Sequence, residues 1–147
     1  MLTFGTDGVR GEFGKELTES YAANLAEVAA RVLQCKTVLI GRDTRESGPV
    51  LEKAIAGALT RIGVEVQLMG VAPTPAIAFA ARKHGVAAIA ITASHNLYKD
   101  NGIKIFAAGG LKLSDAQQAS IEREMKDVIH DRVAHACLPL LIDFSAA

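Results

Sequence analysis

Hydrophobic positions along the chain follow a helical period in four segments. In residues 17–33 the apolar side chains recur every three or four positions, and Thr18 is the candidate N-cap of the helix that this spacing predicts. Three further segments show the same period between residues that start or stop helices. They are residues 48–63 with Pro49 near the start, residues 74–85 opened by Thr74 and Pro75 and closed by Gly85, and residues 115–130 after a capping box of Ser114 and Gln117.

Short apolar or alternating runs between these helices predict strands. The runs are TVLIG at 37–41, VEVQLMG at 64–70, VAAIAIT at 86–92 and GIKIF at 102–106. The third run is apolar throughout, as in a strand covered on both faces, whereas Ile103 and Ile105 alternate with Lys104. Because strands and helices follow each other in turn, we expect a three-layer α/β/α sandwich with a mixed, largely parallel sheet.

Three polar segments interrupt this pattern. They are FGTDGVRGEFG at 4–14, GRDTRESG at 41–48 and TASHN at 92–96. The second and third follow predicted strands, and α/β sheets bind ligands at the carboxyl ends of their strands. We therefore expect the three segments to converge at one edge of the sheet, and we expect the chemistry of the protein there.

Composition narrows the classes of function. The chain has 147 residues, enough for one domain, and its 16 basic residues balance its 16 acidic residues. This balance argues against nucleic acid or an anionic membrane as a partner. Cys35 and Cys137 lack CxxC spacing, which argues against a metal or disulfide framework. Neither a signal-peptide pattern nor a membrane-length apolar run is present, so we expect a cytoplasmic protein.

Ser94 is the sharpest candidate for chemistry. The G-x-S-x-G pattern of a hydrolase is absent, because Thr92 and Asn96 stand where the glycines would be. Adjacent side chains of an extended chain point to opposite faces, so His95 is poorly placed to act as a base for Ser94. A phosphorylated serine fits better, because it needs cationic groups, amides and glycine N–H groups nearby. The chain supplies such groups in Arg10, His95, Asn96 and Lys104.

Two polar segments allow both a structural and a functional interpretation. Glycines around Arg10 would let backbone amides approach an anion, and the guanidinium could donate two hydrogen bonds to a phosphate. Alternatively, the glycines simply mark a turn that carries a surface arginine. In GRDTR, the charges of Arg42, Asp43 and Arg45 either pair as exposed ions or brace the neighbouring loops. For GRDTR we favour the bracing role.

Four motifs in one order resemble a known family. FGTDGVRG, GRDTRESG, APTP and TASHNLYKDNGIKIF resemble the N-terminal, phosphoserine domain of the α-D-phosphohexomutases, over about residues 3–128. Within that family the GTDGVRG opening is most similar to the phosphoglucosamine mutase branch. That branch converts glucosamine 6-phosphate to glucosamine 1-phosphate through a sugar 1,6-bisphosphate.

The resemblance implies a role for each matching residue. Ser94 would carry the phosphoryl group and, through its phosphate, bind Mg²⁺. Lys104 and His95 would handle protons and electrostatics, and Arg10 would stabilise charge. The residues implied in binding substrate or phosphate are Thr6, Asn96, Asn101 and Gly102, the last two by shaping the loop.

The sequence also departs from the family pattern. No DGDGDR-like metal motif is present, and Leu97 replaces the proline that usually follows SHN. We expect residues 1–135 to form the phosphoserine domain and residues 136–147 to form an apolar tail or truncated linker. The expected partners are a phosphosugar substrate and either a second copy of the chain or the remaining mutase domains. The alternative is a non-catalytic binding or regulatory domain derived from a phosphohexomutase.

Overall fold

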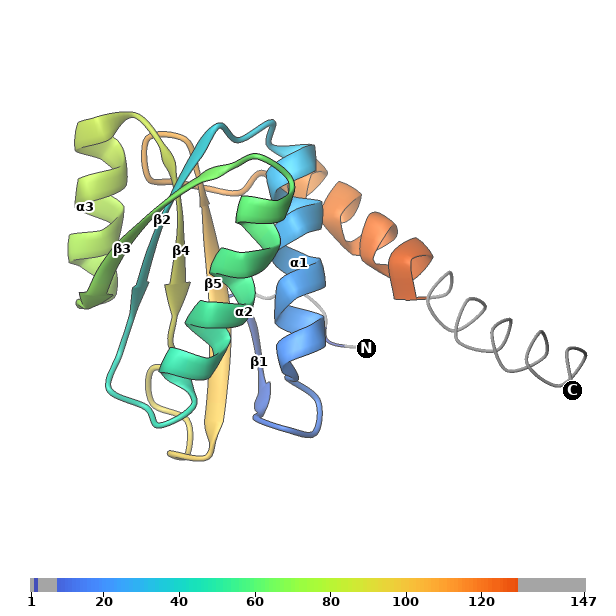
Figure 1. The fold of residues 1–147 in the computed structure, drawn as a ribbon, viewed down its shortest axis with the longest axis vertical. Coiled ribbons are helices and arrows are strands. Elements are labelled where there is room, and N and C mark those ends of the chain that lie inside the picture. The colour runs from blue at the N-terminus through green and yellow to red at the C-terminus, as the bar shows by residue number, and fades with distance from the viewer. Residues whose placement is uncertain (1, 3–7, 130–147) are drawn as a thin grey trace, which may run out of the picture.

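The computed structural model describes residue 2 and residues 8–129, which form one sheet with helices on both faces (Figure 1). The strands are β1 (Val9–Glu12), β2 (Thr37–Arg42), β3 (Glu65–Val71), β4 (Ala87–Ile91), β5 (Asp100–Ala107) and β6 (Leu111–Lys112). The helices are α1 (Glu19–Val32), α2 (Gly48–Arg61) and α3 (Thr74–His84), and residues 115–129 form a further helix.

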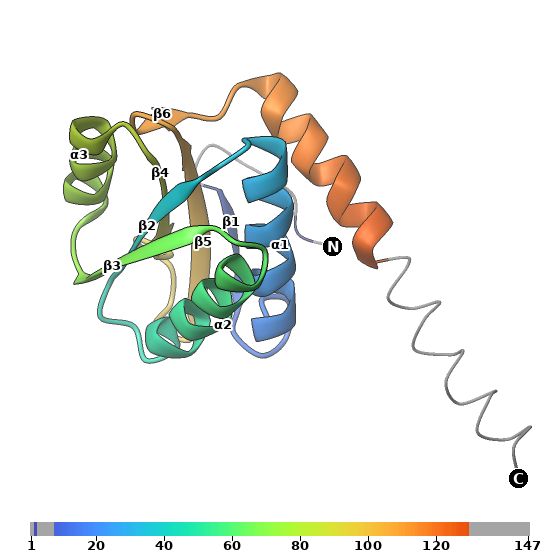
Figure 2. The same cartoon turned by 45° about the horizontal axis from the view of Figure 1, so that its top comes forward.

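Each face of the sheet has its own hydrophobic core. On one face, Ile40 of β2 and Ile89 of β4 pack in a cluster with α1, α2 and the helix of residues 115–129. On the other face, Leu39 of β2 packs against Ile77 of α3. Figure 2 shows α3 on one side of the sheet and the remaining helices on the opposite side. The expected three-layer sandwich is therefore confirmed.

The sheet is mixed, as expected, but its parallel part is limited to three strands. The strand order is β1-β5-β4-β2-β3, with β6 paired to β5. β2 runs parallel to β3 and β4, whereas β5 is antiparallel to β4, β1 and β6. The direction reverses at β5 because only the connection at residues 92–99 separates it from β4, without the helical crossover that parallel strands need.

The glycine-rich segment near the start contains a strand, which its turn-like sequence does not predict. β1 pairs with β5, and Val9 lies opposite Ile103 and is fully buried. Gly8 adopts φ +80°, and a Cβ at this position would collide with the carbonyl oxygen of Ile103. Glycine is a poor strand former, so the local sequence hides this strand, and the ladder with β5 provides its stability.

The predicted capping residues are confirmed. Thr18 caps α1 by accepting a hydrogen bond from the N–H of Tyr21 at 3.0 Å. Ser114 and Gln117 form the reciprocal bonds of a capping box, at 2.9 and 3.1 Å. Gly85 ends α3 in the left-handed conformation, with φ +65°.

Three connections meet at one edge of the sheet. The parallel strands β2 and β4 end together, with Arg42 opposite Ile91, and the N–H of Asp43 donates to the carbonyl of Ile91 at 3.1 Å. At the same edge, β5 begins at Asp100, which lies opposite Glu12 at the end of β1. The residues after β2, β4 and β1 therefore converge, which confirms the expectation for the second and third segments and, in the first segment, for Phe13 and Gly14. Residues 4–7 lie outside the described residues.

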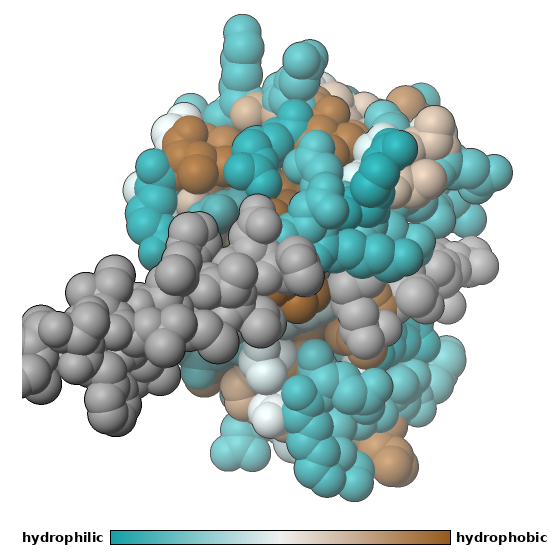
Figure 3. Space-filling view, turned by 90° about the vertical axis from the view of Figure 1, so that its right-hand side faces the viewer, coloured by the Kyte–Doolittle hydropathy of each residue, from teal (hydrophilic) through white to brown (hydrophobic). Residues whose placement is uncertain are grey.

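Some residues singled out in the sequence lie outside the part of the chain that the structure describes. Thr6, Cys137 and the apolar segment 136–147 lie outside the described residues. Among the residues that are described, no helix combines the length and the hydrophobicity needed to cross a membrane. On the α1 side of the molecule, hydrophilic side chains cover most of the described surface, and hydrophobic atoms form separate patches (Figure 3).

Candidate functional site

Arg45 lies where the loops meet, and only 7% of it is exposed. Its Nε donates to Asp43 at 3.1 Å. Its Nη1 and Nη2 donate to four backbone carbonyl oxygens of the loop between β4 and β5, those of Leu97 (2.6 Å), Asp100 (3.1 Å), Ser94 (2.9 Å) and Asn96 (3.1 Å). Arg45 thus braces the neighbouring loop, which confirms the favoured interpretation of GRDTR. The alternative of an exposed ion pair is wrong for this side chain.

Asp43 balances the charge of Arg45 and connects it to β4. One carboxylate oxygen accepts from the backbone N–H of Arg45 at 3.1 Å, and the other accepts from its Nε and from the hydroxyl of Thr92, the latter at 2.7 Å. The Thr92 hydroxyl oxygen in turn accepts from the N–H of Ser94 at 3.1 Å. Arg42, by contrast, pairs with Glu52 of α2 at 3.3 Å. Asp43, Arg45 and Thr92 therefore form one connected network, which reaches the backbone of Ser94.

Ser94 is exposed, and its backbone adopts the left-handed conformation with φ +53°. The extended geometry assumed from the sequence is therefore wrong at this residue, because the chain turns here instead of continuing the strand. His95 beside it is also exposed. Within the described part of the chain, neither the Ser94 hydroxyl nor the His95 ring makes a hydrogen bond. A serine–histidine pair of the hydrolase type is thus not formed.

Arg10 approaches the serine loop, which is residues 92–99 between β4 and β5, from β1. Its Nη1 donates to the side-chain oxygen of Asn96 at 3.1 Å, and the Asn96 amide donates to the carboxylate of Asp100 at 3.3 Å. Arg10 lies opposite Gly102 in the ladder, and a Cβ on this glycine would lie 3.0 Å from Cγ of Arg10. Gly102 therefore leaves room for the arginine side chain to cross β5 toward the loop.

Asn101 and Gly102 both lie within β5, which extends the strand predicted from Gly102 onward, although the resemblance implies that both shape the loop. Both are buried, and Asn101 is fully so. The Asn101 amide donates to the hydroxyl of Ser47 at 2.8 Å, and its oxygen accepts from the N–H of Gly102 at 2.8 Å. In this structure Asn101 therefore fastens the base of the serine loop to the start of α2.

Lys104 lies farther along β5, with its side chain on the same face of the sheet as Gly102 and Arg10. Its Nζ lies 5.4 Å from the centroid of the Phe106 ring, in a cation–π arrangement. No hydrogen bond or ion pair joins Lys104 to Ser94 in the described part of the chain. Arg10 and Lys104 thus lie on the same face of the sheet, and Arg10 contacts the serine loop.

No metal centre is formed by the described residues alone. They contain no group of three or more histidine, cysteine, aspartate or glutamate side chains that could hold an ion. Asp43, the carboxylate of the network, is already bonded to Arg45 and Thr92, and Asp100 accepts from the Asn96 amide. Cys35 is half-buried and unpaired, and burial raises the pKa of its thiol, which favours the unreactive protonated form.

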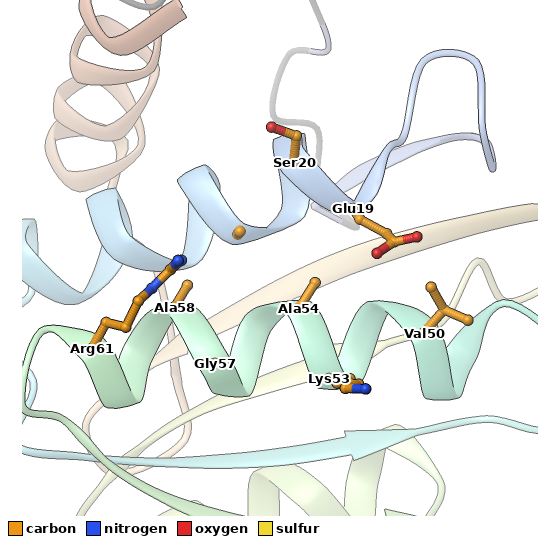
Figure 4. A pocket seen from close by; sticks show the side chains of 9 residues that line it. Glu19, Ser20, Val50, Lys53, Ala54, Gly57, Ala58 and Arg61 are labelled. Atoms are coloured by element: carbon orange, nitrogen blue, oxygen red, sulfur yellow. The ribbon is translucent and has the colours of Figure 1, made fainter.

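The described surface has one hollow beside this site and another between two helices. One, of about 450 Å³, borders the serine loop and is lined by Phe13, Glu46, Ser47, Val50, Tyr98 and Lys99. Another, of about 780 Å³, lies between α1 and α2, where small residues such as Ala54 and Gly57 leave the helix surface open (Figure 4). Arg61 at its rim already pairs with Glu27 at 3.6 Å. The first hollow is the one that adjoins the candidate chemistry.

Several residues of the site have roles that the sequence did not assign. The sequence pattern places Thr92 at the strand tip and gives Ser47 no role, yet both bond the loop that carries Ser94 or its base. One signal could have pointed to Asp43 and Thr92. Polar residues that follow two parallel neighbouring strands must face each other, and a buried arginine between them requires acceptors.

Comparison with known proteins supports the family resemblance seen in the sequence motifs. The family model described as phosphoglucomutase/phosphomannomutase, alpha/beta/alpha domain I, matches residues 1–131. A phosphoglucosamine mutase of Psychrobacter sp. is 45% identical over 139 residues, which are 88% of this chain and 31% of that protein. A phosphoglucosamine mutase of Rhodococcus opacus is 50% identical over 126 residues, 81% of this chain and 28% of that protein.

A solved structure of similar fold supports the same family. The crystal structure of a putative phosphomannomutase from Thermus thermophilus superimposes with a TM-score of 0.77 at 33% identity, covering 83% of this chain and 29% of that one. The chain therefore spans less than a third of the length of these relatives. The motifs, the fold and the matched residues together show that the chain belongs to the phosphoglucomutase/phosphomannomutase family, as its alpha/beta/alpha domain I.

Proposed function

We propose that this chain is the phosphoserine-bearing domain of a phosphoglucosamine mutase, which converts glucosamine 6-phosphate to glucosamine 1-phosphate. The observation that carries the proposal is the setting of Ser94. Its backbone is bonded to a network that includes the buried Arg45, while its hydroxyl is exposed and makes no bond to the described residues. A group that accepts and returns a phosphoryl must be both held in place and open to substrate.

The proposed reaction has two transfers that balance each other. In the first, the bond between phosphorus and Oγ of Ser94 breaks, a bond to the free sugar hydroxyl forms, and the proton of that hydroxyl is released. In the second, the reoriented sugar 1,6-bisphosphate returns its other phosphoryl to Oγ, and the sugar oxygen that is freed takes up a proton. His95 and Lys104 are the groups proposed to handle these protons.

The charge distribution supports an anionic ligand at this place. Arg10 and Lys104 share one face of the sheet, and Arg10 bonds to Asn96 of the serine loop. The negative charge of Asp43 is offset by Arg45 at 3.1 Å. Because phosphoryl transfer relies on positioning and on stabilising charge, cations beside an open serine suit it. Thr6 is also proposed as a phosphate-binding residue, on the family resemblance alone.

Magnesium is proposed as the cofactor. It would neutralise charge on the transferring phosphoryl group. The phosphate on Ser94 would be one ligand, and the others would have to come from outside the described residues, which offer no carboxylate cluster. Glucosamine is proposed as the sugar because the relatives named phosphoglucosamine mutase are 45–50% identical, whereas the putative phosphomannomutase is 33% identical. A cytoplasmic location and a homodimer remain predictions.

A domain exchange tests the proposal. In the Rhodococcus opacus relative, the first domain is replaced by residues 1–131 of this chain, and conversion of glucosamine 6-phosphate is measured beside that of mannose and glucose phosphates. We expect conversion of the glucosamine phosphate, and we expect its loss with Ser94→Ala. Ser114→Ala, a serine change at the distant capping box, should leave conversion intact.

Two results would count against the proposal. Equal activity of the Ser94→Ala chimera would exclude Ser94 as the phosphoryl carrier. A folded chimera that binds the sugar phosphate without converting it would favour the alternative, a binding domain derived from a phosphohexomutase.

A further inference from the structure

The backbone of Ser94 adopts a conformation that its own residue type does not favour. Its φ of +53° lies in the left-handed region, where a serine Cβ meets the following carbonyl oxygen. Ser94 and Gln34 are the non-glycine residues of the described chain with positive φ. Such a conformation persists only where surrounding contacts impose it, and at Ser94 those contacts can be named.

Both backbone polar groups of Ser94 are bonded to the same network. Its N–H donates to the Thr92 hydroxyl oxygen at 3.1 Å, and its carbonyl accepts from Nη2 of Arg45 at 2.9 Å. Thr92 donates to Asp43 at 2.7 Å, and Asp43 accepts from Nε of Arg45 at 3.1 Å. The bonds close a ring that starts and ends at Ser94. The ring fixes the peptide groups on either side of the serine Cα.

Arg45 supports the ring with all of its side-chain donors. A guanidinium has five N–H groups, one on Nε and two on each of Nη1 and Nη2. One bonds to Asp43 and the other four bond to loop carbonyls, so none is left for a phosphate. Arg45 is also almost wholly buried. Its contribution to chemistry must therefore act through the position of Ser94 and not through contact with substrate.

The side chain of Ser94 is the part that the ring leaves free. Its hydroxyl makes no hydrogen bond to the described residues and is open to solvent. The geometry points to Arg45, with Asp43 and Thr92, as the positioning residues that hold Ser94 in its left-handed conformation and so aim its hydroxyl for phosphoryl transfer. This inference rests on the proposed function for the transfer step, but not for the conformation of Ser94.

The test measures conformation and chemistry separately on the same chain. Amide hydrogen exchange and the N–H to Hα coupling of Ser94, both by NMR, report its backbone without any substrate. Phosphoryl uptake from glucosamine 1,6-bisphosphate with Mg²⁺, followed by intact mass, reports the chemistry. The variants are Arg45→Met, Arg45→Lys, Thr92→Val and Thr92→Ser. Thr92→Ser keeps the hydroxyl of the ring, so it is the matched control for Thr92→Val.

In Thr92→Val we expect the Ser94 amide to lose its protection from hydrogen exchange, and its N–H to Hα coupling to change from the value of the left-handed conformation. In Thr92→Ser we expect both to stay as in the wild type. Uptake should fall about 10- to 100-fold in Thr92→Val and Arg45→Met, because small misplacements of a reacting group cost that much. Arg45→Lys should not restore uptake, because an ammonium has three donors in a different geometry. Thr92→Val keeps Arg45 in place, so the inference remains testable if the Arg45 variants unfold.

Each remaining outcome has a distinct meaning. If folded Thr92→Val and Arg45→Met keep the left-handed Ser94 and the wild-type rate, the inference is overturned. If the unmodified chain takes up no phosphate, the transfer step needs groups from outside this chain and is measured in the domain exchange instead, while the NMR comparison still decides whether the ring holds Ser94. If the left-handed coupling is lost without any change in uptake, the positioning role is overturned and a structural role remains.

Discussion

The side-chain amide of Asn101 donates a hydrogen bond to the hydroxyl of Ser47 at 2.8 Å, and this bond joins β5 to the start of α2. Asn101 is fully buried, and Ser47 is the N-cap residue of α2. The serine loop and the segment after β2 are thus connected beneath the surface as well as through Arg45. The loop that carries Ser94 is attached to the sheet at its base and along its length.

Replacing Asn101 by alanine should destabilise the chain by about 1–3 kcal/mol, because the N–H of Gly102 and the Ser47 hydroxyl both lose their partner. Urea unfolding measures the change. Ser47→Ala removes the same bond from its more exposed side and should cost less. A loss below about 0.5 kcal/mol for Asn101→Ala, the range of ordinary surface changes, would show that the buried amide is not a structural link.

Gly102→Ala should be clearly destabilising. Its Cβ would lie 2.6 Å from the carbonyl oxygen of Thr92 and 2.7 Å from that of Val9, and backbone atoms cannot move aside cheaply. We expect a loss of about 1–3 kcal/mol, as for overpacked sites. Gly57→Ala is the matched control, because a Cβ there meets nothing within 4 Å and alanine favours helix. Equal stability of the two variants would contradict this account of Gly102.

Leu97→Pro tests the departure from the family pattern. Leu97 is 68% exposed, and its N–H makes no hydrogen bond to the described residues, so proline removes no backbone hydrogen bond that the structure shows. We expect a gain of about 0.4–1 kcal/mol in thermal unfolding, because proline restricts the unfolded chain. Leu97→Ala changes the side chain without fixing φ and should give no gain. A large loss with proline alone would show that the loop backbone differs from that of its relatives.

Tyr21 should make stability depend on alkaline pH. Burial raises its pKa to about 12, and the charge of Glu122 adds to the effect. The folded state therefore holds this proton more tightly than the unfolded state does. The resulting stabilisation is complete below pH 10 and is lost as pH rises toward 12. The unfolding midpoint of the wild type should fall relative to that of Tyr21→Phe over that window. A constant difference would contradict the raised pKa.

Much of the fold could be predicted because local signals determine it. Thr18 and Ser114 cap their helices as their sequence contexts indicate, and the apolar run at 86–92 gives the central strand β4. β1 could not be predicted, because its glycines favour a turn and its pairing partner lies about ninety residues away in the ladder of Val9 with Ile103. Pairing between distant segments leaves no local pattern.

The sequence predicts where the candidate site lies better than it predicts the conformation of the residues in it. The bracing role of GRDTR follows from polar residues at neighbouring strand ends, and Arg45 fulfils it. The left-handed turn at Ser94 could not be read from the sequence, because serine does not favour it and the ring through Thr92 imposes it. The burial of Asn101 was missed for a similar reason, since β5 begins two residues earlier than its alternating pattern shows.

The central claim is that Ser94 accepts a phosphoryl group, and the most direct test is the intact mass of the chain after incubation with glucosamine 1,6-bisphosphate and Mg²⁺. Our account predicts the addition of a single phosphate, located on Ser94 by fragment analysis, and no addition in Ser94→Ala. Addition to a different residue, or equal addition in Ser94→Ala, would contradict it.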